Sequence, residues 1–173
     1  MSPTTIRLAE TDADFDAARV LGFEWAKTHL EDFPEHQDII EKVFDPDAYA
    51  ATMADLHIIH ARPTGAVLLA ELDGQPVGCV MYQAMEPDVA EIKRLYVSDT
   101  GRGHGLGKAL LTEMFAQMAA DGYTTVRFSS ARFLTHARAL YESVGFTDIP
   151  QPADFPGFLR DFVYFMERPL ART

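Results

Sequence analysis

The chain has 173 residues, about the size of one domain, and 47% of them are hydrophobic and 24% charged, as in a soluble globular protein. Its formal net charge is −11, and residues 1–60 hold 13 acidic but only 4 basic residues. Nucleic-acid binding becomes an unlikely class, because neutralising phosphates requires a basic face. The acidity either keeps the protein soluble or attracts cationic partners such as amines, and charge alone leaves both interpretations open.

Cysteine usage and hydropathy point to a reducing, aqueous compartment. Cys79 is the single cysteine, so no internal disulfide can form. Residues 1–10 lack the basic and apolar regions of a signal peptide, and the longest clean apolar run, Ala66–Ala70, is too short to cross a bilayer. No repeat or linker interrupts the chain. We therefore expect one domain over residues 1–173, located in the cytoplasm and away from membranes.

The first third of the chain predicts a strand followed by helices. Thr5–Ala9 alternates weakly between apolar and polar residues, as an opening strand does. Thr11 or Asp12 can cap a helix in which apolar residues recur at helical spacing. A second helical segment is expected after Pro34, and a short third one after Pro46.

Glycine and proline signals divide the rest of the chain into strands and helices. The predicted strands are Ala66–Leu72, Gln75–Gln83, Glu91–Val97, Thr124–Ser129, Phe146–Ile149 and Asp161–Arg168. One predicted helix follows Gly107 and has Gly122 as its C-terminal cap. A second predicted helix spans Thr135–Val144. Asp73-Gly74 is a hairpin signal between the first two strands. This order predicts an α/β (α+β) fold with a mixed, mostly antiparallel sheet and at least one strand–helix–strand crossover.

The strand Glu91–Val97 contains a break in its alternation. Ile92 lies on the opposite face from Leu95 and Val97 if the period of two is strict. One extra residue, a β-bulge near Lys93-Arg94, would return all three apolar side chains to one face. A strand buried on both faces is the alternative interpretation.

A glycine-rich loop, Arg102–Lys108, lies between this strand and the next helix, where free backbone N–H groups can bind an anion. The dinucleotide fingerprint G-x-G-x-x-G fails in every frame, because Leu106, Lys108 or Leu110 occupies its last position. The nucleotide P-loop fails as well, since Arg102 replaces its first glycine and Ala109 its Ser or Thr. The pattern that remains is R-x-x-G-x-G followed by a helix.

With its flanking segments, this pattern resembles the GNAT superfamily of acyl-CoA-dependent N-acetyltransferases. The resemblance covers residues 66–149. It rests on the hairpin Glu71–Gly78, on Glu91–Val97 with Arg102-x-x-Gly105-x-Gly107, and on Ala137–Phe146. The family fold implies a twisted, mostly antiparallel sheet with a bulged, splayed central strand, flanked by helices. Leu134 departs from the pattern, because the family often has Asn at this position.

The resemblance implies acetyl-CoA as co-substrate, with no metal, and assigns residues to it. The implied cofactor-binding residues are Leu95, Tyr96, Val97, Arg102, Gly103, His104, Gly105, Leu106, Gly107, Lys108, Ala137 and Tyr141. The backbone at Leu95–Val97 would contact pantetheine, and the loop would hold the pyrophosphate. The backbone N–H of Val97 would donate to the thioester oxygen as an oxyanion stabiliser.

Acyl transfer to an amine requires two proton transfers, one from the ammonium and one to the departing thiolate. Tyr141 occupies the family's usual position for the acid, although its ring also suits the apolar side of a helix. Glu91 is the candidate base. The alternative interpretation is that its carboxylate is only a solvated charge at the end of the strand. His136 is a weaker candidate.

Three other residues suggest chemistry that we do not expect. Cys79 sits among apolar residues of a strand and is typical of a small core residue rather than an acyl-enzyme nucleophile. His57 and His60 have ligand-like spacing, but no carboxylate or cysteine completes a metal site nearby.

We therefore predict an enzyme that transfers acetyl from acetyl-CoA directly to a primary amine through a tetrahedral intermediate. The acceptor is expected to be a cationic small molecule, a lysine or an N-terminal amine, and a homodimer is possible. A non-catalytic acyl-CoA sensor is the alternative. Trp25 and Phe155 are candidates for the wall of an acceptor pocket.

Overall fold

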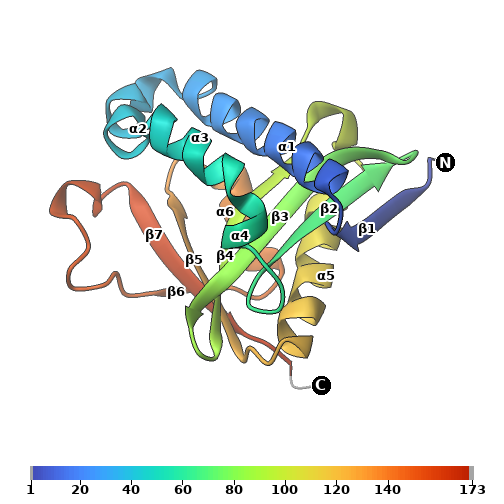
Figure 1. Cartoon of the computed structure of the whole chain (residues 1–173). Coiled ribbons are helices and arrows are strands. Elements are labelled where there is room, and N and C mark those ends of the chain that lie inside the picture. The colour runs from blue at the N-terminus through green and yellow to red at the C-terminus, as the bar shows by residue number, and fades with distance from the viewer. Residues whose placement is uncertain (1, 172–173) are drawn as a thin grey trace.

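The computed structural model describes residues 2–171 and contains one seven-stranded sheet with the strand order β1-β2-β3-β4-β5-β7-β6 (Figure 1). Its strands are β1 (Thr4–Leu8), β2 (Ala66–Leu72), β3 (Gln75–Glu86), β4 (Val89–Val97), β5 (Thr125–Ala131), β6 (Thr147–Ile149) and β7 (Val163–Pro169). All neighbouring strands are antiparallel except β4 and β5, which are parallel. The mixed, mostly antiparallel sheet predicted from the sequence is confirmed.

Helices cover both faces of this sheet (Figure 1). One face carries α1 (Asp12–Glu31), α2 (Gln37–Val43), α3 (Pro46–Ala54) and the short α4 (Leu56–Ile59), and the other carries α5 (Leu106–Ala120) and α6 (Thr135–Ser143). Three 3-10 turns, η1 (Pro34–His36), η2 (Asp99–Gly101) and η3 (Gly157–Leu159), complete the chain. Among residues 2–171, no helix combines the length and the apolar character needed to cross a membrane.

Local signals in the sequence set several element ends. The Thr11 side chain accepts a hydrogen bond from the Asp14 backbone while the Asp14 carboxylate accepts one from the Thr11 backbone, which forms a capping box at the start of α1. Asp73 and Gly74 both have positive φ, 51° and 77°, as a two-residue hairpin turn requires. Gly122, with φ of 95°, follows α5. These predictions from the sequence are confirmed.

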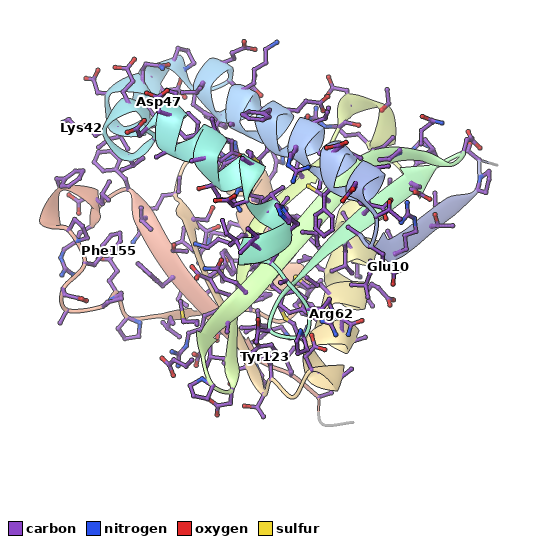
Figure 2. All side chains as sticks on the ribbon, in the orientation of Figure 1. Glu10, Lys42, Asp47, Arg62, Tyr123 and Phe155 are labelled. Atoms are coloured by element: carbon purple, nitrogen blue, oxygen red, sulfur yellow. The ribbon has the colours of Figure 1, made fainter. Side chains whose placement is uncertain are left out.

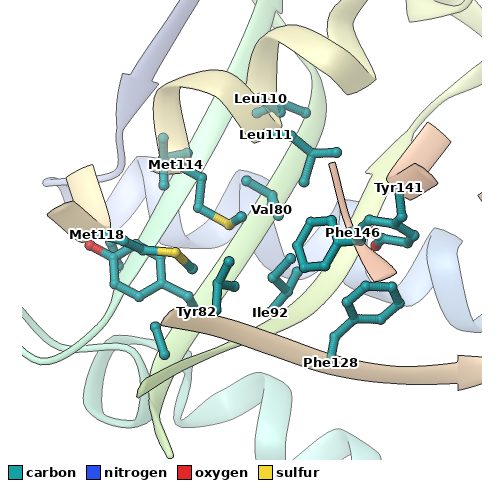
Figure 3. Close-up of a cluster of buried hydrophobic side chains, with 14 of the residues drawn as sticks. Val80, Tyr82, Ile92, Leu110, Leu111, Met114, Met118, Phe128, Tyr141 and Phe146 are labelled. Carbon is teal, nitrogen blue, oxygen red and sulfur yellow. The ribbon is translucent and has the colours of Figure 1, made fainter. Parts of the chain in front are cut away.

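The core has two parts, one on each face of the sheet. Strand β2 contributes to both, since Leu68 packs toward α5 and Leu69 toward α1. The larger part joins β3, β4 and β5 to α5 and α6, and Figure 3 shows its apolar side chains meeting between the helices and the sheet. It includes Val80, Tyr82, Ile92, Leu110, Leu111, Met114, Met118, Phe128, Tyr141 and Phe146.

The predicted bulge is present in β4. The register with β3 shifts between Lys93 and Tyr96, and Arg94 has a positive φ of 52°. As a result Ile92, Leu95 and Val97 all pack on the α5 side of the sheet. The extra residue therefore restores one apolar face, as the broken alternation indicated.

Strands β4 and β5 separate soon after they begin. They pair only from Val89 to Glu91 on β4 and from Thr125 to Arg127 on β5. Beyond this point β5 pairs with β7 alone within the described part of the chain, and β4 with β3. The sheet is thus splayed, and the edges of β4 and β5 that face each other carry free backbone groups.

Candidate active site

The loop before α5 presents a run of free backbone donors. Within residues 2–171, the six consecutive backbone N–H groups from Gly103 to Lys108 donate no hydrogen bond. The first backbone N–H of this turn that does so is that of Ala109, which donates to the Gly105 carbonyl oxygen. Gly103 and Gly105 have positive φ, 81° and 69°, which glycine adopts without strain. Six unpaired amides at the positive end of a 15-residue helix form a cradle for an anion.

The side chains of this amide cradle, Arg102–Lys108, add positive charge at its rim. Arg102 is 60% exposed and pairs with Asp99 at 2.7 Å, and Lys108 is exposed. The imidazole Nδ1 of His104 lies 3.0 Å from the Arg102 carbonyl oxygen, so the ring turns back on the loop. The two cations and the free amides therefore lie on one short, accessible segment.

The free edge of β4 leads from this cradle into the splay. Ser98 donates its N–H to the Val77 carbonyl at 2.8 Å, which makes these two residues a hydrogen-bonded pair across β3 and β4. The neighbouring pair, Gly78 and Val97, is then a non-bonded pair, because the two types alternate in antiparallel strands. The N–H of Val97 is accordingly directed away from β3 and toward the opening beside β5.

The other predicted cofactor residues divide between the two faces. The Leu95 side chain is part of the α5 face, whereas the Tyr96 ring packs on the α1 face, where burial raises the pKa of its hydroxyl. Ala137 lies on α6, one turn before Tyr141, and packs against the larger core. Leu140 limits the space for a side chain at position 107. A Cβ added to Gly107 would lie 3.3 Å from the Leu140 Cδ2, so α5 and α6 approach closely at the cradle.

Tyr141 is almost fully buried where α6 meets β5. Its ring centroid lies 4.0 Å from that of Phe128 and 5.5 Å from that of Phe146. Its hydroxyl forms no hydrogen bond with any other group of residues 2–171, and burial raises its pKa above the ordinary value. Tyr141 therefore remains a protonated donor at neutral pH, although its contacts are also those of a core residue.

Glu91 lies at the last paired position of β4, where the splay begins. Its carboxylate is 2.8 Å from the Lys93 Nζ, and it faces a cavity of about 480 Å³ between β4, β5 and β7. We call this the acidic cavity; it is lined by Met85, Glu86, Glu91, Arg127, Phe128, Ser129, Ile149, Pro150, Pro152, Phe165 and Glu167. Arg127 pairs with Glu167 at 2.7 Å and with Glu86 at 3.2 Å. Three carboxylates lie against the Arg127 guanidinium and the Lys93 ammonium, so one negative charge remains in excess at the cavity.

A second cavity, of about 390 Å³, lies under α1 and α2 and adjoins the first. We call this the apolar cavity; it is lined by Trp25, Ala26, His29, Leu30, Ile39, Ile40, Val43, Phe44, Ser129, Ser130, Ala131, Phe133, Leu134, Phe155, Leu159, Phe162 and Val163. Ser129 lines both cavities, and it directly follows Phe128, the residue that contacts Tyr141. The candidate base thus lines the acidic cavity, and the candidate acid contacts Phe128, which also lines it.

Comparison with known proteins agrees with this geometry. The family model described as Acetyltransferase (GNAT) family matches residues 24–146, which include the cradle, the splayed strands and Tyr141. The chain belongs to the GNAT family. The family predicted from the sequence is confirmed. The alternative of a non-catalytic sensor is not favoured.

Individual GNAT relatives are distant. The N-acetylaspartate synthetase of Danio rerio is 34% identical over 62% of the chain, which covers 40% of that protein's length. An acetyltransferase of the GNAT family from Staphylococcus aureus superimposes with a TM-score of 0.73 at 17% identity, over 98% of this chain and all of the other. The yncA acetyltransferase from Salmonella typhimurium, solved with acetyl-CoA, gives a TM-score of 0.67 at 21% identity, over 99% and 96%. These structures share the GNAT fold.

Several residues considered from the sequence lie away from this GNAT site. Cys79 is fully buried on the α1 face, and burial raises its pKa to about 12, so it is a core residue. The His60 Nδ1 bonds the Tyr82 carbonyl oxygen at 2.9 Å, and His136 is exposed on α6. No cluster of three or more potential metal ligands occurs within residues 2–171.

Sequence reasoning did not identify Arg127, Glu86, Glu167 or Ser129. The signal for two of them was present, because Val126 and Phe128 of β5 are buried toward α5 and Arg127 and Ser129 alternate with them. Their common cavity depends on β7 and on the loop before it, which no local pattern places. Trp25 and Phe155, considered as pocket candidates, both line the apolar cavity.

Proposed function

We propose that this chain transfers the acetyl group of acetyl-CoA directly to a primary amine. The observation that carries the proposal is the amide cradle, which follows the free edge of β4 along the chain. A cradle of six free N–H groups suits a pyrophosphate, and Arg102 and Lys108 add charge for it. The chain's own residues therefore fit the two ends of the donor, its phosphates and its thioester.

The free edge of β4 holds the pantetheine arm in this proposal. Backbone groups of Leu95–Val97 bond its amides, and Ala137 packs beside it. The N–H of Val97 donates to the thioester oxygen, where negative charge develops as the amine attacks. This donor is fixed by the sheet, so no reorganisation is needed at the moment of reaction.

Two side chains move the protons. Tyr141, kept protonated by burial, donates to the departing thiolate. Glu91 accepts a proton from the ammonium, either directly or through one water in the acidic cavity. His136 is exposed on the surface of α6, so Glu91 is preferred as the base.

The acidic cavity supports an amine as the acceptor. Glu86, Glu91 and Glu167 attract an ammonium group to the point where Glu91 can deprotonate it. None of the acidic residues of positions 1–60 lines either cavity. Some of them have structural partners instead, as Asp14 does with Arg7 and with the start of α1. The acceptor is a small-molecule or peptide amine, and the predicted homodimer is a separate question for size-exclusion chromatography.

Binding and turnover test the proposal separately. Acetyl-CoA is expected to raise the melting temperature, because a ligand of the folded state stabilises it, whereas NAD and ATP are expected to have little effect. A panel of primary amines with acetyl-CoA is expected to release free thiol. A larger shift with NAD would contradict the donor assignment, and binding of acetyl-CoA without thiol release from any amine would indicate a sensor.

A further inference from the structure

We infer that the preferred acceptor is a primary amine with an aromatic or branched aliphatic body, which occupies the apolar cavity while its amine lies beside Glu91. This inference rests on the proposed function and adds the substrate class. In this inference the apolar cavity determines which acceptor is preferred. The acetyl donor and the acidic cavity do not determine that preference.

The position of the apolar cavity suits the body of an acceptor. Its floor is Ser129–Ala131 of β5, the segment from which β4 has separated, and its roof is α1 and α2. Ser129 is shared with the acidic cavity, so an amine near Glu91 can extend its body under α1 without leaving the protein. In the acidic cavity such a molecule lies against Phe128, whose ring contacts that of Tyr141.

The wall of the cavity carries no charged side chain. Five aromatic side chains and eight aliphatic residues beyond the floor surround it; the aromatic ones are Trp25, Phe44, Phe133, Phe155 and Phe162. The polar ring in the wall, His29, bonds the Trp25 carbonyl oxygen through Nδ1 at 2.7 Å, and desolvation lowers its pKa, so the ring is neutral at pH 7. A second ammonium group of a diamine would therefore find no carboxylate there, and could pair only with neutral acceptors such as the His29 Nε2, which has no hydrogen-bond partner within residues 2–171.

The size of the cavity suits a small molecule. At about 390 Å³ it lies within the range of about 300–1,000 Å³ typical of ligand pockets. Its outer wall is the loop between β6 and β7, and Figure 2 shows Phe155 on this loop, on the side that faces the segment around Lys42 in α2. The Phe155 ring packs edge-on against Phe165, which lines the acidic cavity, with centroids 5.0 Å apart. Phe155 thus connects the walls of the two cavities.

A series of amines tests this inference. We expect kcat/KM for phenethylamine to exceed that for ethylamine and for 1,4-diaminobutane by about tenfold or more, since burying one ring contributes about that factor. In Phe155→Ala the advantage of phenethylamine over ethylamine is expected to fall several-fold, and in Leu134→Asp it is expected to be lost. Phe158→Ala is the matched control, because Phe158 is on the same loop but is 55% exposed and lines neither cavity.

The outcomes separate the inference from the proposed function. Thiol release with ethylamine or diaminobutane at least as efficient as with phenethylamine would overturn the inference and leave the proposed function intact. Faster turnover of octanoyl-CoA than of acetyl-CoA would also overturn it, because the cavity would then hold the acyl chain. If no amine released thiol, the proposed function would fail. Calorimetric binding of phenethylamine would then decide the inference: binding weakened by Phe155→Ala but not by Phe158→Ala supports it, and no binding overturns it.

Discussion

The substitution Tyr141→Phe removes one hydroxyl group from the centre of the proposed site. The ring would keep its contacts with Phe128 and Phe146, at centroid distances of 4.0 and 5.5 Å. The hydroxyl has no hydrogen-bond partner within residues 2–171, so we expect the free energy of unfolding to change by less than about 1 kcal/mol. A positioned acid contributes about 100- to 10,000-fold to a rate, and the lower end applies here because a thiolate is a good leaving group. We therefore expect kcat to fall by about 100-fold, which corresponds to about 2.7 kcal/mol of transition-state stabilisation.

Thiol release under single-turnover conditions measures this change without interference from product release. Tyr164→Phe is the matched control, because Tyr164 is 2% exposed, contacts Phe128 at 6.0 Å between centroids and has a buried hydroxyl that forms no hydrogen bond within the described residues 2–171. It is expected to leave the rate within about twofold. Equal effects of the two substitutions, or an unchanged rate in Tyr141→Phe between pH 6 and 9, would refute the assignment of Tyr141 as the acid.

Three further changes test the base, the amide cradle and the start of α1. In Glu91→Gln, kcat/KM at pH 7 is expected to fall by about 100-fold and to recover as pH rises, because turnover then depends on amine already neutral in solution; a flat pH profile would contradict this role. Lys108→Ala is expected to raise the Kd for acetyl-CoA about three- to tenfold at low salt and less at high salt, as titration calorimetry can measure, while Lys42→Ala on α2 has no effect. Arg7 and the amides of Glu10 and Thr11 hold the pKa of Asp14 below its ordinary value, so its stabilisation is present above about pH 4 and is lost as pH falls. Asp14→Asn is therefore expected to lower the free energy of unfolding by about 1–2 kcal/mol at pH 7 in urea titrations, and a difference from wild type that does not shrink between pH 5 and pH 2 would contradict the reasoning.

The sequence predicted those parts of the fold that depend on local patterns. The capping box at Thr11, the turn at Asp73-Gly74 and the bulge at Arg94 each follow from a few neighbouring residues, and the structure contains all three. The free N–H groups of the glycine loop follow from its place between a strand and a helix. The family resemblance added the splayed central strand, which local patterns leave open.

The surroundings of the site depend on contacts between distant segments. Glu91 shares its cavity with Arg127 and Glu167, which lie 36 and 76 positions further along the chain and reach it only because β5 and β7 pair beside the splay. Likewise, the net charge of residues 1–60 suggested an acidic acceptor side, yet the carboxylates that line the acidic cavity come from β3, β4 and β7. The location of these carboxylates depends on the tertiary structure, and the charge of residues 1–60 does not predict it.

Direct acetyl transfer to an amine is the central claim, and the fate of a labelled acetyl group tests it most directly. Acetyl-CoA carrying ¹³C in its acetyl group would be incubated with the protein and phenethylamine, and the products and the protein separated by mass spectrometry. We predict the label on the amine nitrogen, in equal amount to the thiol released, with none on Cys79 or any other residue. Label retained on the protein, or recovered as free acetate while the amine stays unmodified, would contradict the claim.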